Sequence, residues 1–134
     1  MTFKKKYHNW GDGKVSYIEW DKDISMPGLQ FCHATGFNAL TYKRLLEPLS
    51  DLFHIRAEDA RGHGLTETSA IPKTIFDWKI YRDDLIQSVE NFVESKGGPI
   101  VLSGHSMGGA SVMQVAAKRP DLVSGIVLVE PVLI

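Results

Sequence analysis

The sequence predicts an α/β fold with a mostly parallel, doubly wound sheet and helices on both of its faces. From about residue 29 onward, strand-like segments alternate with helix-like segments, and this alternation is typical of a parallel sheet. The strand-like segments after Pro27 are continuous apolar runs, as expected where helices cover both faces. A Gly-x-Ser-x-Gly sequence at residues 104–108 joins one such run to a helix-like segment.

Four strands are expected in the first half of the chain. They cover residues 3–8, 15–20, 29–33 and 52–57. The second alternates apolar and polar residues, which is the period of a half-buried strand. The turn at residues 11–13 predicts that it forms a hairpin with the first. Pro27 and Gly28 break the chain before the third strand, in which Cys32 is expected to be a buried small hydrophobe.

A helix is expected between the third and fourth strands. Asn38 would cap its start, and Pro48 should end or kink it. Apolar residues at positions i, i+3, i+4 and i+7 predict one buried stripe along this helix. The stripe consists of Tyr42, Leu45, Leu46 and Leu49.

A longer helix is expected before Gly97 and Gly98, which should end it. Residues 74–77 match a capping box at its start. Its apolar face consists of Leu85, Val89, Phe92 and Val93. On the same helix we expect Trp78 to pack and the charged side chains of residues 81–84 to be solvated.

Two apolar strands, at residues 100–103 and 126–129, flank the last expected helix. That helix ends with Lys118 and Arg119, where the helix dipole favours cations, and Pro120 stops it. If the chain ended soon after the last strand, this strand would be an unpaired apolar edge, which predicts poor solubility or association. The oligomeric state itself is left open.

Composition excludes several classes of function. The chain has 134 residues, the length of one domain, with 43% hydrophobic and 23% charged residues and a net charge of −1. This balance gives no indication of nucleic-acid binding. No apolar run is long enough for a membrane span, and the first residues are not a secretory signal. A single cysteine allows no internal disulfide and favours a cytoplasmic location. No metal-binding or cofactor motif is present, so none is expected.

The Gly-x-Ser-x-Gly sequence carries the strongest indication of chemistry. A strand, a sharp turn with serine at its tip and a helix form a nucleophile elbow. The glycines leave room beside Ser106, whose hydroxyl points out of the sheet towards a substrate. The serine hydroxyl needs a base to remove its proton. None of the 28 residues after Ser106 is histidine, so the usual base is missing from this sequence.

Three motifs together resemble the N-terminal half of an α/β-hydrolase-fold enzyme. Residues 33–36, His-Ala-Thr-Gly, resemble the His-Gly-x-x-Gly loop after the third strand of that family. Residues 59–64 resemble its Asp-x-Arg-Gly-His-Gly loop, and residues 104–108 resemble its elbow. The resemblance implies that residues 1–134 are an incomplete α/β-hydrolase domain, reaching the strand after the elbow, with its C-terminal part missing.

The resemblance also implies roles for individual residues. Ser106 would be the nucleophile, and the backbone N–H groups of Met107 and Thr35 would form the oxyanion hole. Ala34 stands where the family usually has glycine, which leaves the choice between Thr35 and Gly36 open. Serine at the turn favours ester or related acyl substrates, because dehalogenases and epoxide hydrolases of this fold carry aspartate there.

Other polar residues have structural interpretations beside the functional ones. Some family members place the triad acid after the strand that follows the elbow strand, so Glu130 is a candidate acid, although a solvated strand-end carboxylate is the favoured interpretation. His105 is expected to pack beneath the elbow. His33 and His63 lie in motif loops, which such histidines usually anchor in the family.

These observations predict a serine hydrolase that acts on a small acyl compound, with the acid and the histidine supplied by further C-terminal sequence. The alternative is a non-catalytic domain of the same ancestry that binds small acyl compounds or a partner protein. A nucleotide-binding module is disfavoured, because residues 104–108 lack the signatures of phosphate-binding loops.

Overall fold

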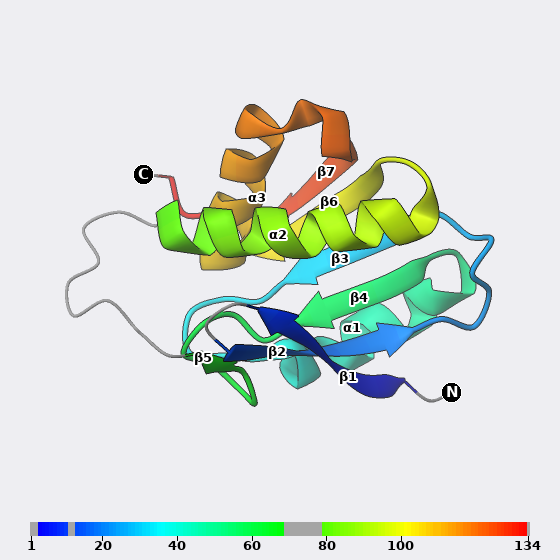
Figure 1. Cartoon of the computed structure of the whole chain (residues 1–134), viewed down its shortest axis with the longest axis horizontal. Helices are drawn as coiled ribbons and strands as arrows, with labels where there is room; N and C mark the ends of the chain where they lie inside the picture. The colour runs from blue at the N-terminus through cyan, green and yellow to red at the C-terminus, as the bar shows by residue number, and fades with distance from the viewer. Residues whose placement is uncertain (1–2, 11–12, 69–78, 134) are drawn as a thin grey trace.

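The computed structural model describes residues 3–10, 13–68 and 79–133 (Figure 1). Within these ranges, one sheet has the strand order β1-β2-β4-β3-β6-β7, and the short β5 pairs with β2. The strands are β1 (Lys4–Trp10), β2 (Gly13–Trp20), β3 (Gly28–Cys32), β4 (His54–Glu58), β5 (Glu67–Thr68), β6 (Ile100–His105) and β7 (Val123–Val129). Residues 11 and 12 of the expected hairpin turn, the capping box and Trp78 lie outside the described residues.

The sheet is parallel where the sequence predicts it. Strand β3 pairs in parallel with β4 on one side and with β6 on the other, and β7 pairs in parallel with β6. Before residue 28 the pairing is antiparallel, with β1 against β2 and β2 against β4. The N-terminal hairpin therefore extends a parallel sheet whose strand ends meet at one edge, where the three motif loops gather.

Helices cover both faces of the sheet (Figure 1). The helices α2 (Lys79–Lys96) and α3 (Met107–Lys118) pack on one face, and the short α1 (Lys43–Leu46) packs on the other. Strand β3 divides its side chains between the two cores, since Phe31 lies in the cluster with α1 and Cys32 in the cluster with α2 and α3. This alternation is expected of a strand covered on both faces.

The predicted helix between β3 and β4 is wrong as a continuous α-helix. Residues 39–51 form a 3-10 turn, the single α-helical turn α1 and a second 3-10 turn that contains Pro48. Leu45 is 52% exposed, because three residues per turn in the flanking 3-10 segments rotate the expected stripe off one face. The predicted cap is present, since Asn38 Oδ1 accepts a hydrogen bond from the Thr41 N–H at 3.1 Å.

The apolar face of α2 is buried as predicted at Leu85, Val89 and Phe92. The helix also ends as predicted. Gly97 has a φ of 75°, and the N–H groups of Gly97 and Gly98 both reach the Val93 carbonyl, at 2.9 and 3.3 Å. These bonds satisfy a carbonyl that the last helical turn would otherwise leave without a partner.

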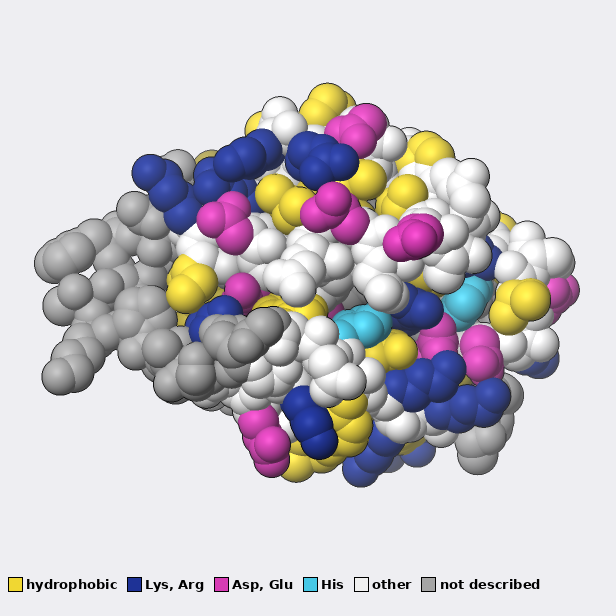
Figure 2. Space-filling model, viewed as in Figure 1, with side chains coloured by type: hydrophobic (Ala, Val, Ile, Leu, Met, Phe, Trp, Pro, Cys, Tyr) yellow, Lys and Arg dark blue, Asp and Glu magenta, His cyan; other side chains and the backbone are white. Residues whose placement is uncertain are grey.

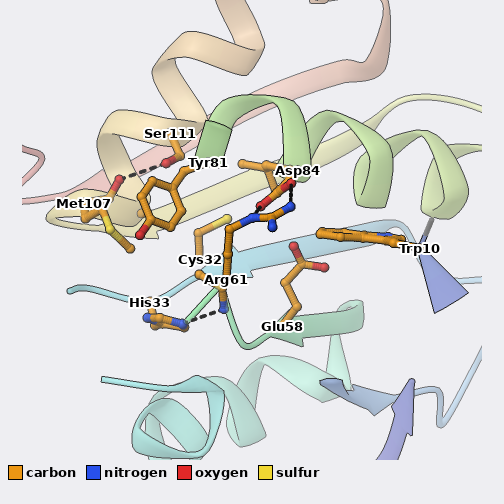
Figure 3. Close-up of a pocket in the computed structure, with 12 residues that line it drawn as sticks. Trp10, Cys32, His33, Glu58, Arg61, Tyr81, Asp84, Met107 and Ser111 are labelled. Carbon is orange, nitrogen blue, oxygen red and sulfur yellow. Dashed lines mark hydrogen bonds and ion pairs between the residues drawn. The ribbon is translucent and has the colours of Figure 1, made fainter. Parts of the chain in front are cut away.

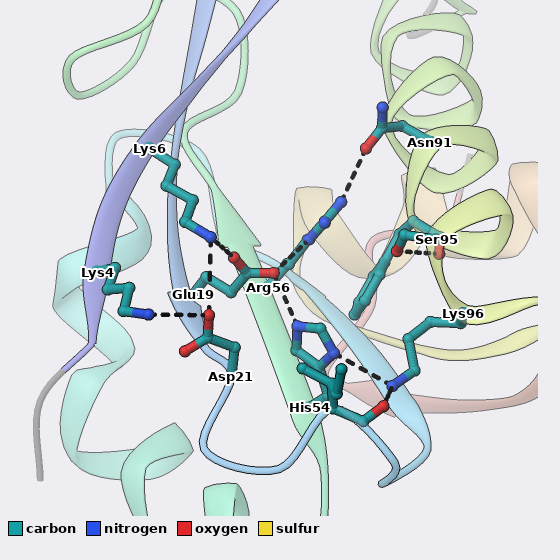
Figure 4. A network of polar contacts seen from close by, with 11 residues as sticks. Lys4, Lys6, Glu19, Asp21, His54, Arg56, Asn91, Ser95 and Lys96 are labelled. Atoms are coloured by element: carbon teal, nitrogen blue, oxygen red, sulfur yellow. Dashed lines mark hydrogen bonds and ion pairs between the residues drawn. The ribbon is translucent and has the colours of Figure 1, made fainter.

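A buried carboxylate in β2 bonds to side chains of both neighbouring strands, β1 and β4 (Figure 4). Glu19 Oε2 accepts hydrogen bonds from His54 Nε2 at 2.7 Å and Arg56 Nε at 2.8 Å, and Lys6 donates to its other oxygen. Burial alone would raise the pKa of Glu19, but these three hydrogen bonds outweigh it and hold the pKa well below its usual range. On the face shown in Figure 2, basic and acidic side chains lie side by side.

The edge strand β7 leads to a prediction about association. In the part of the chain that the structure describes, β7 has a partner on one side only, and Ile126, Val127 and Val129 are 43%, 57% and 41% exposed. We expect the chain to associate at micromolar concentration, and Val127→Lys to reduce this association, because charge on an open edge opposes pairing. Analytical ultracentrifugation would measure it, with Gln87→Lys on the exposed face of α2 as control. A monomeric wild-type chain would contradict the prediction.

Candidate active site

Ser106 occupies a strained turn between β6 and α3. Its φ is 53° and its ψ is −111°, a conformation that costs a residue other than glycine on the order of 1–3 kcal/mol. Neighbouring backbone holds the turn in place. The Ser106 N–H donates to the Val129 carbonyl at 3.1 Å, and the Ser106 carbonyl accepts from Val132 at 3.2 Å and from Ala110 at 3.0 Å. The segment after β7 therefore fixes the backbone of the serine.

Glycines make this tight turn sterically feasible. A Cβ on Gly104 would lie 2.4 Å from the carbonyl carbon of Gly108, and a Cβ on Gly108 would lie 2.1 Å from the Cys32 oxygen. The sequence pattern indicated both of these positions. It did not indicate Gly109, where a Cβ would lie 2.9 Å from the Cβ of Pro131. This contact packs the segment after β7 against the start of α3.

The Ser106 side chain is half-buried and forms no hydrogen bond with any described residue. The ring of the neighbouring His105 contacts Tyr42. The Tyr42 hydroxyl lies 2.7 Å from His105 Nδ1 and accepts the Ala34 N–H at 3.0 Å, so it can donate its own proton to the histidine. Burial raises the pKa of Tyr42, which keeps this phenol a proton donor. Sequence reasoning placed Tyr42 in a helix stripe and missed this link between the two loops.

Two backbone N–H groups that the sequence predicts as oxyanion donors have no partner among the described residues. One belongs to Met107, the first residue of α3, and the other to the exposed Thr35. The N–H of Gly36, by contrast, donates to His63 Nε2 at 3.0 Å. The Gly36 N–H is thus occupied, and of the two predicted candidates only the Thr35 N–H is left without a partner among the described residues.

The loop that carries Thr35 lies against the start of α3. A Cβ on Gly108 would lie only 2.7 Å from the His33 carbonyl oxygen, so only glycine allows this approach. The paired strands agree, since Cys32 at the end of β3 stands opposite Gly104 in β6. Residues 33–36 and residues 104–108, far apart in sequence, therefore form one corner of the molecule.

His33 and His63 link two motif loops, because the ring of each histidine accepts a hydrogen bond from the backbone of the other loop. His33 Nε2 accepts the Ala60 N–H at 2.9 Å, while His63 Nε2 accepts the Gly36 N–H at 3.0 Å. Each Nδ1 faces a carbonyl oxygen, that of Ala34 at 2.8 Å or of Arg61 at 2.9 Å, so both rings act as neutral Nδ1–H tautomers. Burial lowers the pKa of His33, which favours this neutral form.

His63→Phe is expected to loosen the loop that carries Thr35, because the Gly36 N–H would lose its acceptor. The loss of one such hydrogen bond corresponds to about 1 kcal/mol, and hence to roughly fivefold faster hydrogen exchange at the Gly36 amide. Exchange measured by NMR would test this, with His8→Phe as control, because His8 stacks on Tyr17 in the N-terminal hairpin. Equal exchange in both variants would show that His63 does not hold the loop.

The loop at residues 59–64 is built around a buried carboxylate. Asp59 accepts the Ala39 N–H at 2.9 Å through one oxygen and the Leu65 N–H at 3.0 Å through the other. Gly64 has a φ of 52°, and a Cβ there would lie 2.3 Å from the Asp59 carboxylate. Asp59 therefore fixes the conformation of this loop.

The expectation that the charged residues of α2 are solvated is wrong for Asp84. Its side chain is 14% exposed and accepts two hydrogen bonds from the buried Arg61, from Nε at 2.9 Å and from Nη2 at 3.0 Å (Figure 3). This bidentate pair joins α2 to the loop at residues 59–64. The sequence could not reveal it, because the partners are 23 residues apart and on different elements.

Glu130 lies directly after β7, at the end of the strand beside the Ser106 strand. It is exposed and has a φ of 44°, and with Ser106 it is one of two residues other than glycine with positive φ in the described ranges. Its neighbours Val129 and Val132 bond to the Ser106 backbone. Glu130 therefore sits at the same corner as Ser106, although no described residue bonds to its carboxylate.

The described residues include no group of three His, Cys, Asp or Glu side chains suited to a metal ion. Within residues 3–10, 13–68 and 79–133, no helix has the length and apolar character needed to cross a membrane.

The fold is that of the α/β hydrolases. A thioesterase domain from the curacin biosynthetic pathway superposes with a TM-score of 0.86 at 21% identity, covering 99% of this chain and 48% of that domain. The model of the family described as serine aminopeptidase, S33, matches residues 29–134. The chain belongs to this family of α/β hydrolases.

Two curated relatives show the range of proteins to which the chain is similar. It is 34% identical to 2-(acetamidomethylene)succinate hydrolase of Mesorhizobium japonicum, over 79% of this chain and 36% of that protein. It is 32% identical to human monoglyceride lipase, over 92% of this chain and 41% of that protein. The chain thus spans less than half of the length of these relatives.

Proposed function

We propose that the chain carries the nucleophile half of a serine hydrolase for esters or related acyl compounds. The observation that carries the proposal is the strained turn at Ser106, whose hydroxyl has no hydrogen-bond partner among the described residues. Strain of this kind persists only where contacts with the surrounding structure hold the conformation in place. It is concentrated at functional sites. Here the backbone bonds to Val129 and Val132 supply that support.

In the proposed reaction, Ser106 Oγ attacks the acyl carbon and its proton passes to a base. The carbonyl oxygen becomes an oxyanion, to which the N–H groups of Met107 and Thr35 donate. The leaving alcohol takes up a proton, and water then releases the acid and regenerates the serine. The N-terminal end of α3 adds positive potential at the same place.

The remaining groups are assigned as follows. We propose Glu130 as a candidate acid, because its strained conformation places it beside the Ser106 turn. The histidine base would come from sequence outside this chain, since the chain matches only 36% and 41% of the two relatives. Those relatives are a hydrolase and a lipase, which supports an acyl substrate.

Ser106→Ala tests the assignment of the nucleophile. In the full-length protein a fluorophosphonate probe should label the wild type covalently and leave Ser106→Ala unlabelled, because the probe reacts with an activated serine. Mass spectrometry of the labelled peptide would locate the adduct. Ser124→Ala, at an exposed position in β7, is the control and should label like the wild type. Labelling of Ser106→Ala to the wild-type extent would overturn the proposal.

A second candidate is a non-catalytic binding domain of the same family. Such a domain would need no base to activate Ser106. Binding of a small acyl compound with no labelling of Ser106 in the full-length protein would support it over the hydrolase.

A further inference from the structure

A small cavity lies beside the start of α3, the helix that follows Ser106 (Figure 3). Its volume of about 30 Å³ suits one or two water molecules and is too small for a substrate. Met107 and Gly108 line it from the start of α3, and His33 lines it from the end of β3. The cavity therefore touches both segments that supply the candidate oxyanion donors.

The Glu58 carboxyl borders this cavity. Glu58 is the last residue of β4 and is 7% exposed, and in Figure 3 its carboxyl points towards the Arg61–Asp84 pair and Trp10. Its buried Oε2 has no hydrogen bond to a described residue. The Ser88 hydroxyl is close enough to influence Glu58, but it also lacks a partner of good geometry. An ionised carboxylate in such a place would be costly.

The elements packed around Glu58 present charges of both signs to it. The titratable and charged groups that face Glu58 are Tyr17, Cys32, Arg56, Asp59, Arg61 and Asp84. The cavity is also lined by His33 and Tyr81, whereas α3 contributes only uncharged side chains. Burial, with Asp84 and Asp59 nearby, raises the pKa of Glu58 to about 8. Glu58 is therefore mainly protonated at neutral pH.

A series of contacts leads from this carboxyl to the candidate oxyanion loop, and its first step is electrostatic. An ionised Glu58 would repel Asp84 and attract Arg61, which bonds to Asp84 in the present arrangement. Arg61 shares its loop with His63, and the Arg61 carbonyl accepts from the Nδ1–H of His63. His63 in turn holds the Gly36 N–H beside Thr35.

We propose that Glu58 is a positioning residue for the Ser106 site and that it acts in its protonated form. Loss of its proton draws Arg61 from Asp84 and shifts the loop whose His63 holds Gly36, and it places a negative charge behind the start of α3. Only the effect on reaction at Ser106 rests on the proposed function; the coupling between Glu58 and the two loops does not.

NMR of the whole chain with ¹³C-labelled glutamate tests the coupling. We expect the Glu58 carboxyl to titrate near pH 8, and the amide signals of Thr35, Gly36 and Met107 to shift with the same midpoint. In Glu58→Gln both the titration and the amide step should be lost. The control Glu94→Gln, at an exposed position of α2, should keep both.

Two results would overturn the proposal. One is a Glu58 carboxyl that is ionised throughout the neutral range, and the other is a set of loop amides that do not respond to its titration. If Glu58→Gln does not fold, the wild-type titration decides alone.

Labelling of Ser106 in the full-length protein adds a separate readout. The labelling rate of the wild type should fall roughly tenfold per pH unit above the Glu58 pKa, and that of Glu58→Gln should not. Absence of labelling would refute the proposed function and leave the NMR result standing.

Discussion

Gly108→Ala is expected to destabilise the chain by about 3 kcal/mol or more, because its new methyl group meets backbone on a neighbouring strand. The added Cβ would lie 2.1 Å from the Cys32 oxygen and 2.7 Å from the His33 oxygen. Main-chain atoms at the end of β3 cannot rotate away as a flexible side chain can. The start of α3 must therefore move off the sheet, together with the Ser106 turn.

Urea unfolding of Gly108→Ala and of Gly125→Ala measures this effect with a matched control. Both substitutions add one methyl group to a glycine, in α3 for Gly108 and in β7 for Gly125, but a Cβ on Gly125 would meet no atom within 4 Å. The control should change the free energy of unfolding by no more than about 0.5 kcal/mol. Equal stability of the two variants would mean that α3 does not approach β3 as closely as the structure shows.

The tight turn at Ser106 explains why part of the site could be predicted from the sequence. Gly104 and Gly108 are local signals, because the steric demand of the turn falls on residues four apart in the chain. Continuous apolar runs at β3 and β6 likewise report burial on two faces without knowledge of the partner strands. Features of this kind depend on neighbours in sequence, and they predicted the parallel part of the sheet.

Other features depend on contacts between distant segments, which periodicity cannot report. The Tyr42 hydroxyl joins His105 to the Ala34 loop, and Asp84 pairs with Arg61, and no pattern in the sequence indicates these partners. The error at Leu45 has a different origin. Its apolar spacing fits an α-helix, but the chain around Pro48 forms 3-10 turns, in which that spacing does not mark one face.

The role of Glu58, like those of Tyr42 and Asp84, could not be predicted, because nothing in the sequence distinguishes it from a solvated glutamate. Its position at the end of β4, between the sheet and α2, makes it buried, and burial raises its pKa from 4.5 to about 8. A carboxyl with a raised pKa in the folded state binds its proton more tightly there than in the unfolded chain. Between these two pKa values the unfolded chain is ionised first, so folding stability must fall as pH rises.

We therefore expect the wild-type chain to lose about 1.4 kcal/mol of unfolding free energy per pH unit between pH 4.5 and about 8 from Glu58 alone. Below this window Glu58 is protonated in both states, and above it the loss levels off. Glu58→Gln removes the ionisable group, and at neutral pH it should gain stability over the wild type of about 3 kcal/mol, less the cost of burying an amide. Urea unfolding at several pH values would show the difference as a flatter stability profile for Glu58→Gln, with Glu94→Gln retaining the wild-type slope. Parallel profiles for the wild type and Glu58→Gln would show that the carboxyl is ionised in the folded chain.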